Sequence, residues 1–165
     1  QDPVIADKLL RITDGLPQKV RMLVDVLPDD IEFLVRARLA ELETRELETL
    51  QLASLFGRPI APGALAVLSK VPRSTIDQLL SHGFLALDNS GAVAHLSVSE
   101  SYESHPMLSV DDKKARQAMH KASAEHLQTQ QSINLDESLH EPIARHLLEA
   151  GQVDHAAPHA LAAGR

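Results

Sequence analysis

Apolar residues recur at helical spacing through most of the chain. They fall three and four positions apart before and after a break at Gly15 and Pro17, and again from residue 31 to residue 56. The longer stretch is expected to divide into two helices near Thr44, a residue type that serves as a simple N-cap. The pattern predicts a mainly helical protein.

The centre of the chain predicts two short helices and a hairpin. Gly57 is placed to end the preceding helix in a left-handed conformation. Helices are expected over 62–69 and 72–81. Short apolar runs at 84–87 and 92–96 then flank a DNSG turn sequence, which is typical of a β-hairpin. Three helices followed by a hairpin predict a winged helix, a variant of the helix-turn-helix.

The last third of the chain predicts three more helices. The first covers residues 111–130, and the acidic pair before it complements the helix dipole. The second ends at Gly151 and has Pro142 in its first turn. The third would cover 153–163, although Pro158 argues against a regular helix there. Small residues and glycine turns of this kind are typical of the first helices of a repeat array.

Composition narrows the class of protein. The chain has 165 residues, of which 44% are apolar and 24% charged, as expected of a folded soluble domain. Three Phe, one Tyr and no Trp leave little for stacking on single-stranded nucleic acid. The lack of Cys excludes disulfides and thiolate metal sites and fits a reducing cytoplasm. No membrane span, signal peptide or initiator Met is seen, so we expect a segment of a larger protein.

The charge balance disfavours nucleic acid as a partner. Sixteen basic residues stand against 23 acidic ones, for a net charge of −7 spread evenly along the sequence. Binding to a phosphate backbone needs a basic face that releases counterions. Protein domains, subunits or small molecules are therefore the favoured partners.

Motifs for catalysis or metal binding are missing from the sequence. The nine His residues are scattered, with no H-E-x-x-H pattern and no Cys beside them, so no metal is expected. There is neither a nucleophile elbow nor a glycine-rich phosphate loop, and the segment is not expected to be an enzyme by itself.

A DNA-binding winged helix would place the helix at 72–81 in the major groove. The polar residues available there for base edges and phosphate are Lys70, Arg73, Ser74, Thr75 and Gln78. The expected hairpin tip, DNSG, carries no basic residue for the backbone.

Several stretches in sequence order resemble the regulatory half of a STAND-class signal-transduction ATPase, a group of AAA+-related switches that includes large bacterial transcription regulators. ITDGLPQKVRMLVDVL resembles the end of the helical lid, and RELETLQLASLFGRPIAPGALAVLSKVPRSTIDQLLSHGFLAL resembles the family's winged helix. SYESHPM stands where the family has a histidine after a strand. ARQAMHKASAEHL and ARHLLEAGQVDHAAPHALAAG resemble the first helices of the TPR-like region that follows.

The resemblance implies domains and a nucleotide site. Residues 1–28 would end the lid, 29–110 would form the winged helix, and 111–165 would open the repeat region. Pro17, in the turn with Gly15, would lie against the adenine of ATP or ADP, and His105 would reach the β-phosphate of ADP. The P-loop would lie in an upstream nucleotide-binding domain of the same chain.

The expected function is regulatory and non-catalytic. The segment would couple the nucleotide state of that upstream domain to signalling or transcriptional output in the cytoplasm, as a two-state element biased by ligand. The alternative is a DNA-binding winged-helix regulator with a helical dimerisation or effector tail. A helical scaffold without a ligand is the third hypothesis.

Overall fold

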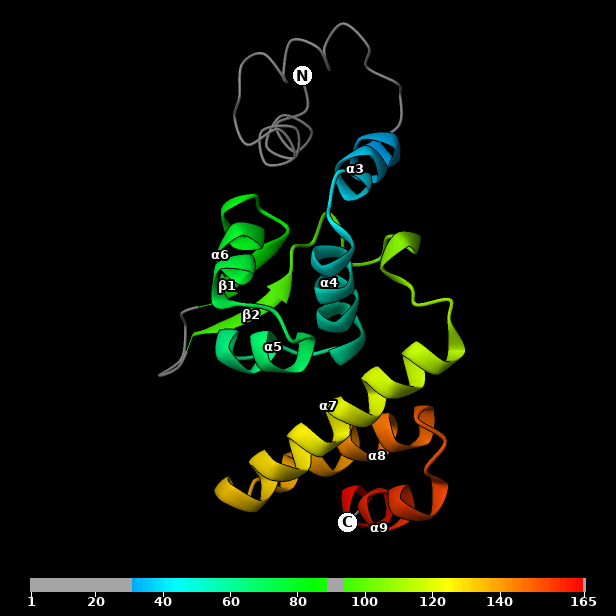
Figure 1. The fold of residues 1–165 in the computed structure, drawn as a ribbon. Coiled ribbons are helices and arrows are strands. Elements are labelled where there is room, and N and C mark those ends of the chain that lie inside the picture. Colours follow the sequence, from blue (N-terminus) through cyan, green and yellow to red (C-terminus); the bar gives the residue numbers. More distant parts are fainter. Residues whose placement is uncertain (1–30, 89–93, 165) are drawn as a thin grey trace, which may run out of the picture. The chain divides into compact units, whose positions relative to one another are not determined.

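The computed structural model describes residues 31–88 and 94–164, and these are mainly helical. Within those ranges seven α-helices accompany one two-stranded antiparallel sheet (Figure 1). The mainly α prediction is confirmed. The chain divides into an N-terminal unit that ends at Ser109 and a C-terminal unit that begins at Val110, and each is described by itself. None of the described helices has both the length and the apolar composition that crossing a membrane requires.

Among its described residues, the N-terminal unit has four helices, one antiparallel strand pair and a short 3-10 turn. Its elements in chain order are α3 (Ile31–Ala40), α4 (Thr44–Phe56), α5 (Pro62–Ser69), α6 (Arg73–Ser81), β1 (Leu85–Asp88), β2 (His95–Val98) and η1 (Pro106–Leu108). The predicted division of the 31–56 stretch into two helices is confirmed. The expected lid residues 1–28, with Gly15 and Pro17, lie outside the described residues.

The start of α4 differs from the sequence prediction. Glu43, not Thr44, is the N-cap, and it forms a reciprocal capping box with Glu46. The Glu43 N–H donates to Glu46 Oε2 at 2.9 Å, and the Glu43 side chain accepts from the N3 backbone. The two carboxylates also complement the positive end of the helix dipole, so the Thr44 prediction is wrong. Gly57 ends α4 with φ 68°, as predicted.

The sheet is joined by a third stretch of chain. Leu85 pairs with Val98 and Asp88 with His95 across β1 and β2, which confirms the predicted antiparallel pair. Residues 89–93, which include the predicted turn, are not described. Ile60, between α4 and α5, forms a bridge with Leu96, with N···O distances of 2.9 and 2.7 Å in the two directions. The β2 strand therefore has a partner on each side.

One apolar core holds these elements together. Each helix from α3 to α6 and each strand contributes fully or nearly fully buried aliphatic side chains, and they include Leu39, Leu50, Leu65, Ile76, Leu79, Leu85 and Leu96. In α6 the buried residues Ile76 and Leu79 lie on the inner face, while Ser74 and Gln78 are exposed. Phe56, Phe84 and Tyr102 add buried aromatic rings to this mainly aliphatic core.

In the described residues of the C-terminal unit, all regular elements are helices. Its elements are α7 (Lys113–Asn134), η2 (Glu137–Leu139), α8 (His140–Glu149) and α9 (Val153–Ala163). Asp112, one of the acidic pair expected to complement the helix dipole, also caps α7 by accepting from the N–H groups of Lys114 and Ala115 at 2.7 and 3.1 Å. Gly151, with φ 77°, makes the turn from α8 to α9.

Pro158 does not interrupt α9. The predicted helix over 153–163 is confirmed, because α9 runs from Val153 to Ala163 with this proline inside it, and the prediction from Pro158 against a regular helix is wrong. Pro158 is exposed and is the sixth residue of the helix, so it removes the bond that an N–H there would donate to Asp154 O. Ala156, fully buried on the other side of the helix, anchors that first turn. Packing against α8 therefore outweighs the cost of the proline.

Candidate functional site

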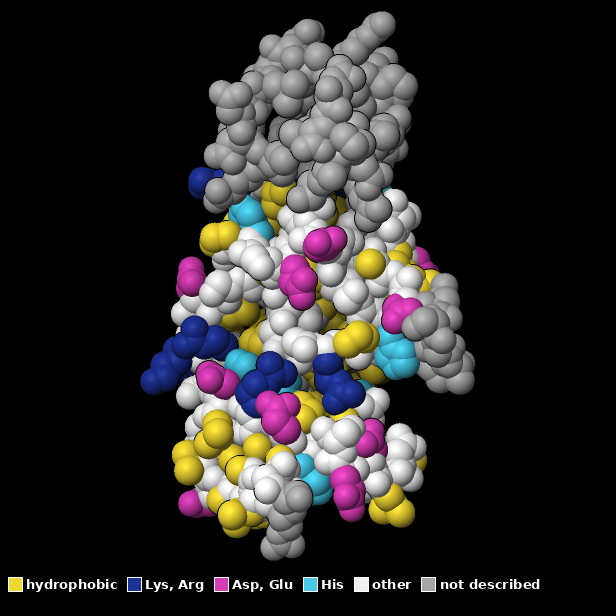
Figure 2. Space-filling model, turned by 180° about the vertical axis from the view of Figure 1, so that it is seen from behind, with side chains coloured by type: hydrophobic (Ala, Val, Ile, Leu, Met, Phe, Trp, Pro, Cys, Tyr) yellow, Lys and Arg dark blue, Asp and Glu magenta, His cyan; other side chains and the backbone are white. Residues whose placement is uncertain are grey.

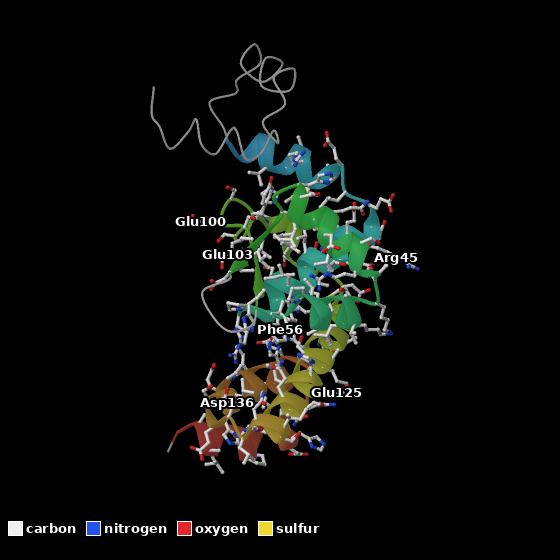
Figure 3. All side chains as sticks on the ribbon, turned by 90° about the vertical axis from the view of Figure 1, so that its left-hand side faces the viewer. Arg45, Phe56, Glu100, Glu103, Glu125 and Asp136 are labelled. Atoms are coloured by element: carbon white, nitrogen blue, oxygen red, sulfur yellow. The ribbon has the colours of Figure 1, made fainter. Side chains whose placement is uncertain are left out.

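The segment that carries His105 follows β2 and is folded into tight turns. The Ser99 N–H donates to Phe84 O at 3.0 Å, the Tyr102 N–H to Ser99 O at 2.8 Å, and the His105 N–H to Tyr102 O at 2.9 Å. The Tyr102 ring is buried, with its centroid 5.0 Å from that of Phe84. These contacts fix the backbone that leads to His105. Glu100 and Glu103 lie on the outer edge of the same segment (Figure 3).

The imidazole of His105 caps η1. Its Nδ1 accepts the N–H of Met107 at 3.2 Å, and its carbonyl accepts from Leu108 at 2.9 Å. The Gln51 side chain on α4 donates to Met107 O at 3.0 Å and Ser109 O at 3.3 Å, which ties η1 to α4. An Nδ1 that accepts from a backbone N–H assigns the ring hydrogen of a neutral imidazole to Nε2. His105 is half-buried and can therefore offer one Nε2–H donor to an anionic oxygen.

The residues of the DNA-binding alternative lie around α6. Arg73, Ser74 and Gln78 are exposed, Thr75 is half-buried, and Lys70 ends α5 in a left-handed conformation with φ 55°. The Arg73 guanidinium is paired, because its Nε lies 3.1 Å from Asp77 Oδ1 one turn along the helix. In the space-filling view, Asp and Glu side chains lie among the Lys and Arg side chains of the face shown (Figure 2). On α6 itself, the exposed residues Arg73, Ser74 and Gln78 stand beside the acidic Asp77, which pairs with Arg73.

Arg38 is a buried cation that the sequence analysis missed. It lies on α3, is 9% exposed, and donates from Nη2 to His82 O at the end of α6 at 2.9 Å. Its guanidinium carbon stands 5.0 Å from the centroid of the Phe84 ring. Since the carbonyl end of a helix carries partial negative charge, Arg38 links α3 electrostatically to α6.

Two pairs of histidines, also missed, join the helices of the C-terminal unit. The Nδ1 atoms of His120 on α7 and His146 on α8 lie 2.9 Å apart, and both side chains are buried. The Nδ1 atoms of His140 on α8 and His159 on α9 lie 3.0 Å apart, and His159 Nε2 lies 3.3 Å from Gln128 Nε2 on α7.

A sequence signal for these pairs exists. An H-x-L-x-A-G pattern occurs twice, at 146–151 and 159–164, and each copy starts with a paired histidine. Each of these histidines meets a histidine of the preceding helix, His120 for His146 and His140 for His159.

Burial lowers the pKa of several histidines in this unit. The pKa of His120 lies below its usual range, chiefly through burial, with Glu149 opposing the shift and Arg145 and Arg116 adding to it. Burial also lowers the pKa of His126 on α7. The pKa of His159 is lowered by burial and by the charge of His140. The neutral imidazole is therefore the favoured form of these three side chains.

Among the described residues, no three or more His, Asp or Glu side chains converge with the geometry to hold a metal ion. A pocket of about 500 Å³ does open at the C-terminal end of α7. It is lined by Gln128, Gln131, Ser132, Leu135, Asp136, Glu137 and His140.

Comparison of the chain with protein-family models, curated proteins and solved structures found no match. The resemblance to STAND-class ATPases therefore stays a prediction.

The predicted nucleotide site is only partly described. Of its three residues, His105 is positioned as an Nε2–H donor, while Gly15 and Pro17 lie outside the described residues.

Proposed function

We propose that α4 to β2 form a winged helix. The order of elements is one helix, a short extended stretch at Ile60, two helices, and a hairpin whose second strand pairs with Ile60. A winged helix requires this order, with the hairpin following its third helix. The fold by itself fixes no function, since the same arrangement serves in DNA binding and in protein contacts.

The function that we propose is regulatory and non-catalytic. The chain would be the part of a STAND-type ATPase that couples the ATP or ADP state of an upstream P-loop domain to signalling or transcriptional output. The observation that carries this proposal is the geometry of His105. Its Nδ1 accepts the Met107 N–H, so Nε2–H is the donor that the neutral ring can offer to a ligand. A donor held in one orientation is suited to a phosphate oxygen, where a charge-assisted bond forms.

In this proposal, the hydrogen bonds from Gln51 to the η1 segment couple His105 to α4. Because the Gln51 side chain binds two carbonyls of the His105 segment, a displacement of His105 by nucleotide would be transmitted to α4. The partners are then the nucleotide-binding domain of the same chain and other protein domains or subunits. In this proposal, residues 111–165 begin a TPR-like region, supported by the repeated H-x-L-x-A-G pattern.

Direct DNA binding is the competing function, and it makes a distinct prediction. The Asp77 carboxylate beside Arg73 and the net charge of −7 both oppose contact with phosphate. We expect no association of the 165-residue chain with duplex DNA in a mobility-shift assay at about 50 mM salt, a concentration at which counterion release still favours binding. Association that weakens steeply with added salt would contradict the regulatory proposal and favour the DNA-binding regulator.

The coding sequence upstream of Gln1 provides a direct experiment. The proposal requires a G-x-x-x-x-G-K-(S/T) loop at a strand–helix junction within about 300 codons, the span of about two domains. An upstream region without such a loop would overturn the proposal and leave the scaffold or the DNA-binding protein as the remaining hypotheses.

A further inference from the structure

The two histidine pairs of the C-terminal unit limit how many protons their imidazole rings can carry. Two ring nitrogens 2.9 or 3.0 Å apart form a hydrogen bond only when one carries the hydrogen and the other offers its lone pair. Each pair therefore needs at least one neutral imidazole. When both rings are charged, two N–H groups face each other across the same gap, and the hydrogen bond becomes a repulsion.

We propose that residues 110–165 form an acid-sensitive helical unit, in which a second proton on either histidine pair separates the helices that the pair joins. The His120–His146 pair would release α8 from α7, and the His140–His159 pair would release α9 from α8. This inference is independent of the proposed nucleotide role, because it concerns neither His105 nor its segment.

The surroundings of the buried pair favour the singly protonated or neutral form. His146 is 0% exposed and His120 is 9% exposed, so a second charge there would be taken out of water. The charged groups around His120 are Arg116 on α7 and Arg145 and Glu149 on α8. Two cations against one carboxylate leave this environment unfavourable to a further positive charge.

The second pair is more accessible to protons. His140 lines the open pocket at the end of α7, together with the carboxylates of Asp136 and Glu137. The Asp136 carboxylate is already engaged, since it accepts from the N–H and the hydroxyl of Ser138 at 3.0 and 2.6 Å. On the other side, His159 contacts the Gln128 amide, which is neutral. The His140–His159 pair is thus the less buried of the two and can exchange protons with solvent more readily.

The sign of the pH effect follows from the lowered pKa values of His120 and His159. The unfolded chain, whose histidines titrate near the usual value of about 6.5, binds more protons than the folded unit below that pH. The pairs therefore contribute their full stability above about pH 6.5 and lose it as the pH falls below. His126, whose pKa is also lowered by burial, acts in the same direction.

Hydrogen exchange of the full 165-residue chain, measured by mass spectrometry, tests the proposal. We expect protection of peptides from 113–163, corrected for intrinsic exchange, to fall at least about tenfold between about pH 7.5 and 5.5, since one pH unit changes a protonation ratio tenfold. Peptides from 44–98 are the internal control, because their histidines, His82 and His95, are not buried. An equal change in both units would overturn the proposal.

Variants of the buried His120–His146 pair test whether that pair causes the fall in protection at low pH. Asn places an amide near the position of Nδ1, so His120→Asn with His146→Asn keeps a polar contact that cannot titrate. We expect this double variant to lose at least half of the pH effect, while His155→Gln, an exposed histidine on α9, leaves it unchanged. A double variant that folds and keeps the whole pH effect would contradict the assignment.

If the double variant fails to fold, a second measurement on the unaltered chain tests the proposal. NMR titration of the histidine ring protons in the unaltered chain should then show the His120 and His146 rings taking up their second proton below the usual histidine pKa value of about 6.5, in separate steps. Titration of both rings together at about pH 6.5 would overturn the proposal.

Discussion

Replacing Ile76 by Ala should destabilise the N-terminal unit by about 2–5 kcal/mol, the range seen when a large buried aliphatic side chain is truncated. Ile76 is 0% exposed and lies on the inner face of α6, beside the equally buried Leu79. Truncation removes apolar area from the core and leaves a cavity that neighbouring side chains fill only in part. Urea denaturation followed by circular dichroism measures the change as a lower transition midpoint.

Gln78→Ala is the matched control for Ile76→Ala. Gln78 lies on the same helix, is exposed, and its side chain belongs to the face of the DNA-binding alternative. We expect a change within about 0.5 kcal/mol, as for an ordinary surface substitution. Equal destabilisation by both variants would contradict the assignment of Ile76 to the core and Gln78 to the surface.

Replacing Arg38 by Ala should destabilise the same unit by about 2–3 kcal/mol, through loss of a charged hydrogen bond and a desolvated cation–π contact. The guanidinium binds His82 O at 2.9 Å and lies over the Phe84 ring. Both contacts join α3 to the end of α6 and the start of the sheet. Thermal unfolding of the full chain, with hydrogen exchange of the α3 peptide, measures the effect.

Arg36→Ala is the control for Arg38, because Arg36 is exposed on the same helix. Arg38→Lys should recover only part of the stability, since an ammonium cannot reproduce the planar stacking of a guanidinium. Full recovery by Lys would show that charge alone matters and would refute the stacking contribution.

Local patterns predicted most of the secondary structure. The 62–69 helix, the paired strands around the DNSG sequence, Gly57 at the end of α4 and the cap at Asp112 follow from residues within one turn or hairpin of one another. Such signals depend on backbone geometry and on spacing along the chain, which the sequence displays directly.

The errors and omissions have physical causes. Glu43 is the N-cap of α4 in place of Thr44 because Glu46 completes a capping box with it. The two candidate caps are adjacent in the sequence, and each has a side chain that can accept a hydrogen bond. Pro158 is tolerated because α9 packs on α8, which helix propensity does not take into account. Arg38 meets His82 from 44 positions away, and His120 meets His146 from 26 positions away. Contacts of that separation depend on tertiary packing, and the repeated H-x-L-x-A-G pattern marks one histidine of each pair without showing its partner.

The rate of ADP release from the full-length parent protein with His105→Asn tests whether His105 holds the nucleotide. Asn can still accept the Met107 N–H at the δ position, so it keeps the cap of η1 while removing the Nε2–H donor. His82→Ala, an exposed histidine of the same unit, is the control. The account predicts about tenfold faster release for His105→Asn, the factor for a loss of about 1.4 kcal/mol, and no change for the control. Release at the unaltered rate from both variants would contradict the role of His105 in holding the nucleotide.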